Sequence, residues 1–327
     1  MNKNNLQISI IVVNFNGFEL TKNLINSILK SDQKINKEII VIDNHSPDKS
    51  GQALKKEFSK NKQVSVYFRD ENDFLTAAYN YGFIKSKGKI VVFMNNDILV
   101  TNNWLKSISK ELERENAGLV GVNMFSPDEK IDNLGCSLNI LGYAKRIATG
   151  QFFKSNPKTS HLFFIPGSLI AANRDFFNQL GGFDESFLGN YEDVDLAWRT
   201  RLLNKNIKIA KKAKVYHLGS QTVKKYLKNY QSSFLCRKNR LATIIKNAGP
   251  LYLSLVLPVY LIFQIIIFLK ELLFQKELAL ATPRALFWNI DNLEDLLIKR
   301  KAIQLTRKTS DWQIIKSMIF RKGTKNL

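Results

Sequence analysis

The chain has 327 residues, of which 45% are hydrophobic and 24% are charged. A chain of this length and composition can bury one or two sizeable cores, which excludes a disordered or fibrous protein. Lys and Arg outnumber Asp and Glu by 49 to 28, for a net charge of +21, which suits an anionic partner such as a polyanion, a membrane face or a diphosphate, with a solvated basic face as the alternative. Cys136 and Cys236 lie far apart without metal-ligand spacing, and we interpret them as reduced and structural.

Short apolar runs alternate with helical periodicity in the N-terminal part of the chain. The apolar runs predict buried strands at residues 6–13, 38–42, 64–68, 90–94 and 118–122. The helical spacing predicts helices at residues 19–30, 50–58, 76–85 and 104–115. This alternation indicates βαβ units and a mostly parallel, doubly wound sheet, which is an α/β fold. The first run is too short for a signal peptide, and neither a Gly-x-Gly-x-x-Gly nor a Walker-type Lys loop occurs, which argues against a Rossmann domain and a phosphate-loop NTPase.

The following segment, residues 123–157, has only short β-like pieces separated by glycines. Beyond it, apolar runs predict strands at residues 163–166, 169–172 and 208–216. Helical spacing predicts a helix at residues 174–180, with Gly181 as its C-cap. His217 follows the last of these strands, where a lone His is more often structural than a ligand.

Carboxylates follow two of the predicted strands. Asp97 closes Asn95-Asn96-Asp97 after the strand at residues 90–94, and Asp43 closes the strand at residues 38–42. The carboxyl ends of parallel strands lie at the edge where α/β sheets bind ligands, so the two carboxylates could share a cleft. A lone Asp with substrate phosphates is a normal arrangement for Mg²⁺ or Mn²⁺. The alternative is a strand that ends in an Asx-turn.

Glu192, Asp193 and Asp195 open a further predicted helix, where acids suit the positive end of the helix dipole. Asp195 and Arg199 are spaced i, i+4 and can pair. In one interpretation the three acids only cap and salt-bridge the helix. In the other, the apolar run that follows them keeps the site partly desolvated, which raises the pKa of a general base toward working pH.

The C-terminal third joins a basic stretch to an apolar one. Residues 196–270 contain no acid, and residues 199–246 contain fourteen Lys and Arg. Residues 251–269 are almost wholly apolar, and a helix of that length would be about 28 Å long, close to the thickness of a bilayer core. Basic residues flank both ends of this stretch and Pro258 would kink it. We therefore favour helices that lie in the cytoplasmic membrane interface, with one transmembrane segment at residues 251–269 as the alternative. Amphipathic helices are predicted at residues 287–305 and 311–320.

Seven motifs together resemble the family 2 glycosyltransferases of GT-A fold, particularly the rhamnosyltransferase-like branch. The motifs are ISIIVVNFNG (8–17), VIDNHSPD (41–48), ENDFLTAAYNYG (71–82), FMNND (93–97), GGFDESF (181–187), YEDVDLAWR (191–199) and YHLGS (216–220), and the match covers residues 6–250. The chain has Phe74 where the family usually has a Gly that permits close backbone approach, so we expect a reshaped donor pocket. The resemblance implies a GT-A catalytic domain at residues 1–222, and the basic and apolar stretches predict a membrane-associated helical region at residues 223–327.

The resemblance also implies roles for individual residues. Asp193 would be the catalytic base, with Glu192 beside it. Asp97 would hold Mg²⁺ or Mn²⁺ in place of the family's Asp-x-Asp, and His217 matches a position that completes the metal site in some members. A UDP- or dTDP-linked sugar would be bound by Asn14, Asn16, Asp43, Asn72, Asn95, Asn96 and Arg199, with Asp43 reading the pyrimidine.

These expectations combine into one function. The chain would be a metal-dependent, inverting glycosyltransferase that extends a lipid-linked or glycan acceptor in cell-surface polysaccharide synthesis, as a peripheral protein at the cytoplasmic face of the membrane. The alternative is a catalytically inactive GT-A module that serves as a membrane-bound binding or scaffold subunit, and the presence of Asp97 and Asp193 argues against it. A nucleic-acid partner is not expected, because no nucleic-acid-binding signature occurs and the basic stretch adjoins an apolar one.

Overall fold

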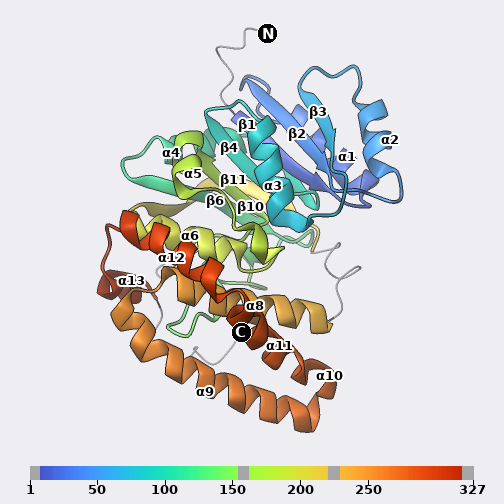
Figure 1. Ribbon diagram of the computed structural model, residues 1–327. Helices are drawn as coiled ribbons and strands as arrows, with labels where there is room; N and C mark the ends of the chain where they lie inside the picture. The colour runs from blue at the N-terminus through green and yellow to red at the C-terminus, as the bar shows by residue number, and fades with distance from the viewer. Residues whose placement is uncertain (1–7, 154–161, 220–228, 319–327) are drawn as a thin grey trace.

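The computed structural model describes residues 8–153, 162–219 and 229–318 (Figure 1). Within these ranges a nine-stranded sheet forms the centre of the protein, and β8 and β9 form a separate two-stranded ribbon. The strands are β1 Ile8–Asn14, β2 Lys37–Asp43, β3 Val64–Phe68, β4 Ile90–Asn95, β5 Ile98–Val100, β6 Ala117–Phe125, β7 Ile131–Asn133, β8 Cys136–Leu138, β9 Ala144–Arg146, β10 Leu169–Asn173 and β11 Asn206–His217. The helices are α1 Phe18–Lys30, α2 Ser50–Glu57, α3 Phe74–Lys85, α4 Trp104–Leu112, α5 Arg174–Leu180, α6 Glu192–Leu202, α8 Asn229–Asn247, α9 Pro250–Phe274, α10 Lys276–Ala279, α11 Ala281–Asp291, α12 Leu293–Thr306 and α13 Asp311–Ser317.

The N-terminal half of the sheet is parallel, as predicted. β3, β2, β1 and β4 lie in this order, and each pairs in parallel with its neighbour. The other half of the sheet is mixed, because β6 pairs in parallel with β11, whereas β10 lies antiparallel between β4 and β6, and β5 is antiparallel to β11. The short apolar run of β10 is buried on both faces, like a parallel strand, so its composition did not show its direction.

Side chains of the central strands alternate between two hydrophobic cores. In β1, Ile8, Ile10 and Val12 face the core shared with α1, α2 and α4. Ile11 faces the opposite core, which is shared with α3, α5 and α6. Phe93 of β4 is fully buried in that second core, with its ring centroid 4.5 Å from that of Phe177. Helices therefore cover both faces of the sheet, as predicted.

The segment between β6 and β10 takes a form that the sequence did not show. β7 adds to the sheet beside β6, and β8 and β9 form the ribbon. The strand predicted at residues 163–166 is wrong, since it reduces to one isolated bridge between Phe164 and Cys136. Pro166 and Gly167 end this run, and a proline cannot donate to a strand ladder.

The C-terminal helices pack below α6 in the view of Figure 1. α8 contacts α6 and α9, and it also packs against α11 and α12. Leu241 and Ile244 of α8 belong to the same hydrophobic core as Ile11 and Phe93 of the sheet. The division of the chain at residues 222 and 223 stays a prediction, and this core extends across it.

α9 runs along the outside of the molecule (Figure 1). Tyr252, Val256, Tyr260 and Gln264 are buried at intervals of four residues, so one face of α9 packs on the protein over several turns. By length and composition, α9 is the one helix in the described ranges that could cross a membrane. Its large exposed apolar residues are Leu251, Leu255, Val259, Ile262, Phe263, Ile265, Ile266, Leu269, Leu272, Leu273 and Phe274.

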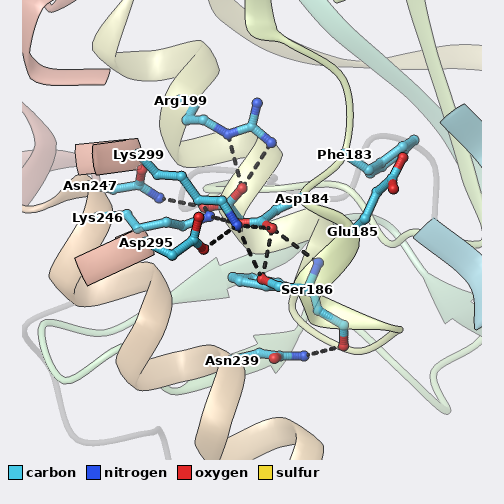
Figure 2. A network of polar contacts seen from close by, with 12 residues as sticks. Phe183, Asp184, Glu185, Ser186, Arg199, Asn239, Lys246, Asn247, Asp295 and Lys299 are labelled. Atoms are coloured by element: carbon cyan, nitrogen blue, oxygen red, sulfur yellow. Dashed lines mark hydrogen bonds and ion pairs between the residues drawn. The ribbon is translucent and has the colours of Figure 1, made fainter. Parts of the chain in front are cut away.

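Buried ion pairs join α6, α8 and α12 (Figure 2). Lys246 of α8 pairs with Asp184, and its Nζ also lies 3.1 Å from Oδ1 of Asp195 in α6. Nζ of Lys299 in α12 lies 2.9 Å from Oδ1 of Asp184. Burial alone would raise the pKa of Asp184, but the two lysines lower this pKa well below its usual value. We call Asp184, Asp195, Lys246 and Lys299 the ionic network.

Candidate active site

A cleft of about 800 Å³ opens at the carboxyl ends of β1 and β4. The turn before β10, the loop before α6 and the segment from β7 to β9 supply much of its wall. This is the edge at which α/β sheets bind ligands. The predicted site residues that line the cleft are Asn72, Asn95, Asn96, Asp97, Glu192, Asp193 and His217.

Asn14 and Asp43 lie next to the cleft lining rather than in it. They are opposite each other in the β1–β2 register, and both are almost fully buried. Nδ2 of Asn14 donates to Oδ1 of Asp43 at 2.8 Å, and the Ser46 hydroxyl donates to the same oxygen at 2.6 Å. The backbone amide of Asn16 in turn donates to the Ser46 hydroxyl at 3.1 Å. This network fixes the ends of the two strands beside the cleft.

Arg199 is not among the residues that line the cleft. Its Nη2 lies 2.8 Å from Oδ2 of Asp195, which confirms the predicted i, i+4 pair. Its Nη1 donates to the backbone oxygens of Leu180 and Gly182 at 2.6 and 3.0 Å. The guanidinium is thus engaged by buried protein groups, and this position gives no support to the prediction that Arg199 binds the donor.

Phe74 begins α3 in a backbone conformation that suits glycine. Its φ is +63°, in the left-handed region, which costs a residue with a Cβ about 1–2 kcal/mol. Nδ2 of Asn44 holds this turn by donating to Oδ1 of Asn72 at 2.7 Å and to the Phe74 carbonyl at 3.0 Å. The Phe74 ring is 44% exposed and lines the cleft. Phe74 therefore has a left-handed backbone conformation of the kind that glycine adopts easily, and it adds an aromatic ring to the pocket.

The pairing of β5 with β11 brings Asp97 and His217 together. Oδ2 of Asp97 lies 3.4 Å from Nε2 of His217. On the other side of the ring, Nδ1 of His217 lies 3.0 Å from Oδ2 of Asp132. Burial alone would lower the pKa of His217, but the carboxylates of Asp132 and Asp97 raise this pKa to about 9.

These side chains fit a divalent cation. Two ligands at right angles on an ion with bonds of about 2.1 Å lie about 3 Å apart, close to the separation of Asp97 and His217. Nε2 of His217 has no hydrogen-bond partner within the described structure, while Nδ1 is held by a carboxylate, as is usual for a metal-ligating His. No group of three or more His, Cys, Asp or Glu in the described ranges could hold a metal. The arrangement therefore suits an ion whose remaining ligands come from substrate and water.

Glu192 and Asp193 are held against the turn before β10. The Gly167 amide donates to Oδ2 of Asp193 at 2.9 Å. A Cβ on Gly167 would lie 2.5 Å from Oε1 of Glu192, so a larger residue there would displace the Glu192 carboxylate from this position. Burial raises the pKa of Glu192, with the charge of Asp193 adding to the effect, and burial also raises the pKa of Asp193. Carboxylates with raised pKa values in a cleft are candidates for a general base.

Sequence reasoning missed Asp132 and Arg146, which also line the cleft. Nη1 of Arg146 lies 3.0 Å from Oδ1 of Asp132. The two residues lie in β7 and β9, which have three residues each and carry no motif, so no sequence signal marked them. Cys136 and Cys236 are free cysteines, as predicted.

Solved structures share this fold. GalNAc-T7 in complex with UDP, GalNAc and Mn²⁺ is 18% identical with a TM-score of 0.61, and the match covers 77% of this chain and 49% of that chain. The mannosyltransferase PcManGT from Pyrobaculum calidifontis in complex with GDP-Man and Mn²⁺ is 14% identical with a TM-score of 0.55, and the match covers 95% of this chain and 83% of that chain. The protein thus has the GT-A type of α/β fold.

The model of glycosyl transferase family 2 matches residues 9–181, and the chain belongs to this family. It is 24% identical over 201 residues to the O-antigen biosynthesis protein RfbC of Myxococcus xanthus, a match that covers 59% of this chain but only 16% of RfbC. It is also 24% identical over 226 residues to the dTDP-rhamnosyl transferase RfbF of Shigella flexneri, which covers 67% of this chain and 72% of RfbF.

Proposed function

We propose that the chain is a metal-dependent, inverting glycosyltransferase that moves a sugar from a nucleoside-diphosphate sugar to a lipid-linked or glycan acceptor in cell-surface polysaccharide synthesis. The observation that carries this proposal is that one cleft joins the buried carboxylate of Glu192 and the half-buried carboxylate of Asp193 to the pair Asp97 and His217. Similarity to proteins named for O-antigen biosynthesis and dTDP-rhamnosyl transfer supports a polysaccharide product and, of the UDP- and dTDP-linked donors, the dTDP-linked one.

Asp193 is the base in this proposal. It takes the proton from an acceptor hydroxyl while that oxygen attacks the anomeric carbon from the face opposite the diphosphate. A new C–O bond forms as the bond to the diphosphate breaks, so the configuration inverts. The Gly167 amide fixes one carboxylate oxygen, which supports the near-attack geometry that such a displacement needs.

Asp97 and His217 would hold Mg²⁺ or Mn²⁺, and Asp132 would orient the His217 ring. When bound, the ion offsets the negative charge on the leaving nucleoside diphosphate. Arg146 and Lys145 add positive charge to the cleft wall. Because the chain itself offers two ligands, the affinity for the ion should rise when the diphosphate is present.

The donor lies among the asparagines of the cleft in this proposal. The Tyr79 hydroxyl donates to Oδ1 of Asn95 at 3.0 Å, and Nδ2 of Asn96 donates to Thr21 at 3.1 Å, so both side chains are held by the protein. Asn72 stands at the turn before α3, while Asn14, Asn16 and Asp43 support the strand ends behind the lining. Phe15 and Phe74 in the lining offer aromatic faces on which a base can stack.

We also place the protein at the cytoplasmic face of the membrane as a monotopic protein, with α9 lying in the interface. The buried stripe of α9 supports this choice over the transmembrane alternative, because a helix bound lengthwise to the protein cannot also be surrounded by lipid. Nε2 of Gln264 donates to the Tyr143 hydroxyl at 2.9 Å, within that stripe. The exposed apolar face would then enter the lipid.

A turnover assay tests the proposal. The full chain is incubated with a panel of UDP- and dTDP-linked sugars, Mn²⁺ and a lipid-linked acceptor in vesicles, and release of the nucleoside diphosphate is followed. We expect transfer from one donor, with an inverted anomeric configuration in the product by NMR. Binding of a donor without turnover on any acceptor would support the alternative, an inactive membrane-bound module.

A further inference from the structure

We propose that Asn239 of α8 is a positioning residue that clamps the loop in front of the catalytic carboxylates. The inference rests on the proposed role of Asp193. Nδ2 of Asn239 donates to the backbone oxygens of Phe187, Gly189 and Asn190 at 2.9, 2.8 and 2.7 Å. A carboxamide nitrogen has two protons, so the three carbonyls converge on it and share them. Figure 2 shows Asn239 beneath the turn that contains Ser186.

The clamped loop has an unfavourable backbone conformation. Leu188, Asn190 and Tyr191 have φ values of +65°, +60° and +67°, in the left-handed region. Such conformations persist only where the surroundings enforce them, and they concentrate at functional sites. The loop lines the cleft, and Tyr191 is the N-cap of α6, so its conformation sets where Glu192 and Asp193 begin the helix.

Neighbouring contacts show that α8 follows this loop closely. Nζ of Lys238 donates to the Ser186 carbonyl at 2.6 Å, and Nε of Arg240 donates to the Tyr191 hydroxyl at 2.8 Å. Asn239 lies between Lys238 and Arg240 in α8, and it binds carbonyls between Phe187 and Asn190 in the middle of the loop. From the opposite side, the Leu75 amide of α3 donates to the Leu188 carbonyl at 3.0 Å.

Asn239 differs from the other buried asparagines of α8 and α11 in the three carbonyls of one loop that its nitrogen binds, because Asn247 and Asn289 also have a buried Oδ1 without a partner in the described ranges. The Asn239 side chain is fully buried, yet its Oδ1 has no hydrogen-bond partner in the part of the chain that the structure describes. A buried acceptor without a partner is costly, and a residue without that oxygen would avoid the cost. The functional group of Asn239 is therefore its Nδ2 donor. The three loop carbonyls that this donor binds explain why an asparagine stands at this position.

The test compares Asn239→Asp with the matched control Asn289→Asp. The first variant keeps the shape but replaces the donor with an acceptor that faces three carbonyls. Asn289 is as deeply buried, and its Nδ2 donates to the Lys238 and Ala285 carbonyls, away from the loop. We measure kcat, the KM for the donor, and hydrogen exchange of the backbone amides at residues 187–191 in each full-length protein.

We expect Asn239→Asp to lower kcat by about 100-fold, the cost of a misplaced catalytic group, with little change in the KM for the donor. Exchange at residues 187–191 should rise, and Asn289→Asp should alter neither quantity. Unchanged exchange in the loop, or parental kcat with a loosened loop, would overturn the inference. Should Asn239→Asp fail to fold, Asn239→Ser, which keeps one donor, should retain more activity than Asn239→Ala, and equal kcat values would count against the clamp. A parent without turnover defeats the proposed function, whereas the exchange experiment still tests the clamp.

Discussion

Burial determines the pH at which Asp193 can accept a proton. Its pKa is raised above the usual value for Asp, so the carboxylate is protonated, and useless as a base, over a wider acidic range than an exposed Asp. The same burial gives the ionised form a stronger affinity for the proton of an acceptor hydroxyl. The raised pKa thus makes the Asp193 carboxylate a stronger base, but it also leaves a smaller fraction of the carboxylate ionised at low pH.

The first prediction follows for the pH profile. We expect kcat/KM to rise with pH through an apparent pKa above about 4, the usual value for Asp. Asp193→Asn should lower turnover by about 10²–10⁴-fold, because the amide cannot accept the proton. Steady-state rates between pH 4 and 9 check both expectations. The matched variant Glu192→Gln should lower turnover by a smaller factor than Asp193→Asn. If Glu192→Gln lowered turnover more, the role of base would move to Glu192.

The second prediction concerns Asp132. If it orients His217, Asp132→Asn should weaken Mn²⁺ binding by about 10–100-fold, the usual effect of losing such a partner. Electron paramagnetic resonance titration of the protein with Mn²⁺ and nucleoside diphosphate measures this without turnover. Asp97→Ala should abolish the site, and EDTA should inhibit the parent. Asp128→Asn, which changes an exposed acid paired with Lys130, is the control and should bind Mn²⁺ like the parent.

At the scale of elements, the ionic network ties α6 to α8 and α12. The Lys246 side chain is 2% exposed and lies between two carboxylates that are themselves buried. Removing it leaves Asp184 with only Lys299 and Asp195 with only Arg199 as cationic partners, and losing a buried partner costs more than losing an exposed ion pair. The C-terminal helices therefore support the helix that begins with Glu192 and Asp193.

The third prediction is that Lys246→Met lowers the free energy of unfolding by about 3–5 kcal/mol. The control Lys214→Met removes an exposed ion pair with Glu129, and it should change the free energy of unfolding by less than about 1 kcal/mol. Because the pKa of Asp184 is lowered in the folded protein, the contribution of the network is present at neutral pH. It is lost as the pH falls through the folded-state pKa, so parent and variant should converge in acid. Urea unfolding at several pH values measures these differences.

The sequence predicted elements well where long apolar runs and caps mark them. β1 to β4 with their helices, and α6 beginning at Glu192, were found within a few residues. β5, β7, β8 and β9 have three residues each and no periodicity, so β5 was missed, β7 to β9 were predicted only as short β-like pieces without bounds, and Asp132 was not marked. Motif order predicted seven of the residues that line the cleft, whereas the contribution of α8 depends on contacts between residues far apart in the chain.

At the scale of the whole molecule, charge and apolar surface should act on membranes in different ways. Each Lys or Arg near an anionic surface contributes about 1 kcal/mol, and salt screens this contribution within a Debye length. Burial of the exposed face of α9 contributes a term that salt does not weaken. Salt therefore separates the two contributions.

The fourth prediction is that the full chain stays on anionic vesicles in high salt and needs detergent for release. Ile262→Ser with Ile266→Ser removes two exposed apolar residues of α9 and should make binding sensitive to salt. Ile84→Ser with Leu305→Ser changes residues that are at least as exposed on α3 and α12, and should bind like the parent. Flotation in low and high salt measures this. A parent free of vesicles in both salts would make the α9 face a protein interface instead.

The attachment of α9 has a consequence for the length of the glycan. The Tyr252 hydroxyl donates to the Ile140 carbonyl and Gln264 donates to Tyr143, and both partners lie in the turn of the β8–β9 ribbon that lines the cleft. With α9 in the bilayer surface, the cleft would stand at a constant height above the lipid. An acceptor would then react only when its terminal sugar reaches that height. The enzyme would then act only on acceptors with a certain number of sugars. Each growing glycan would receive its new sugar at one stage of growth.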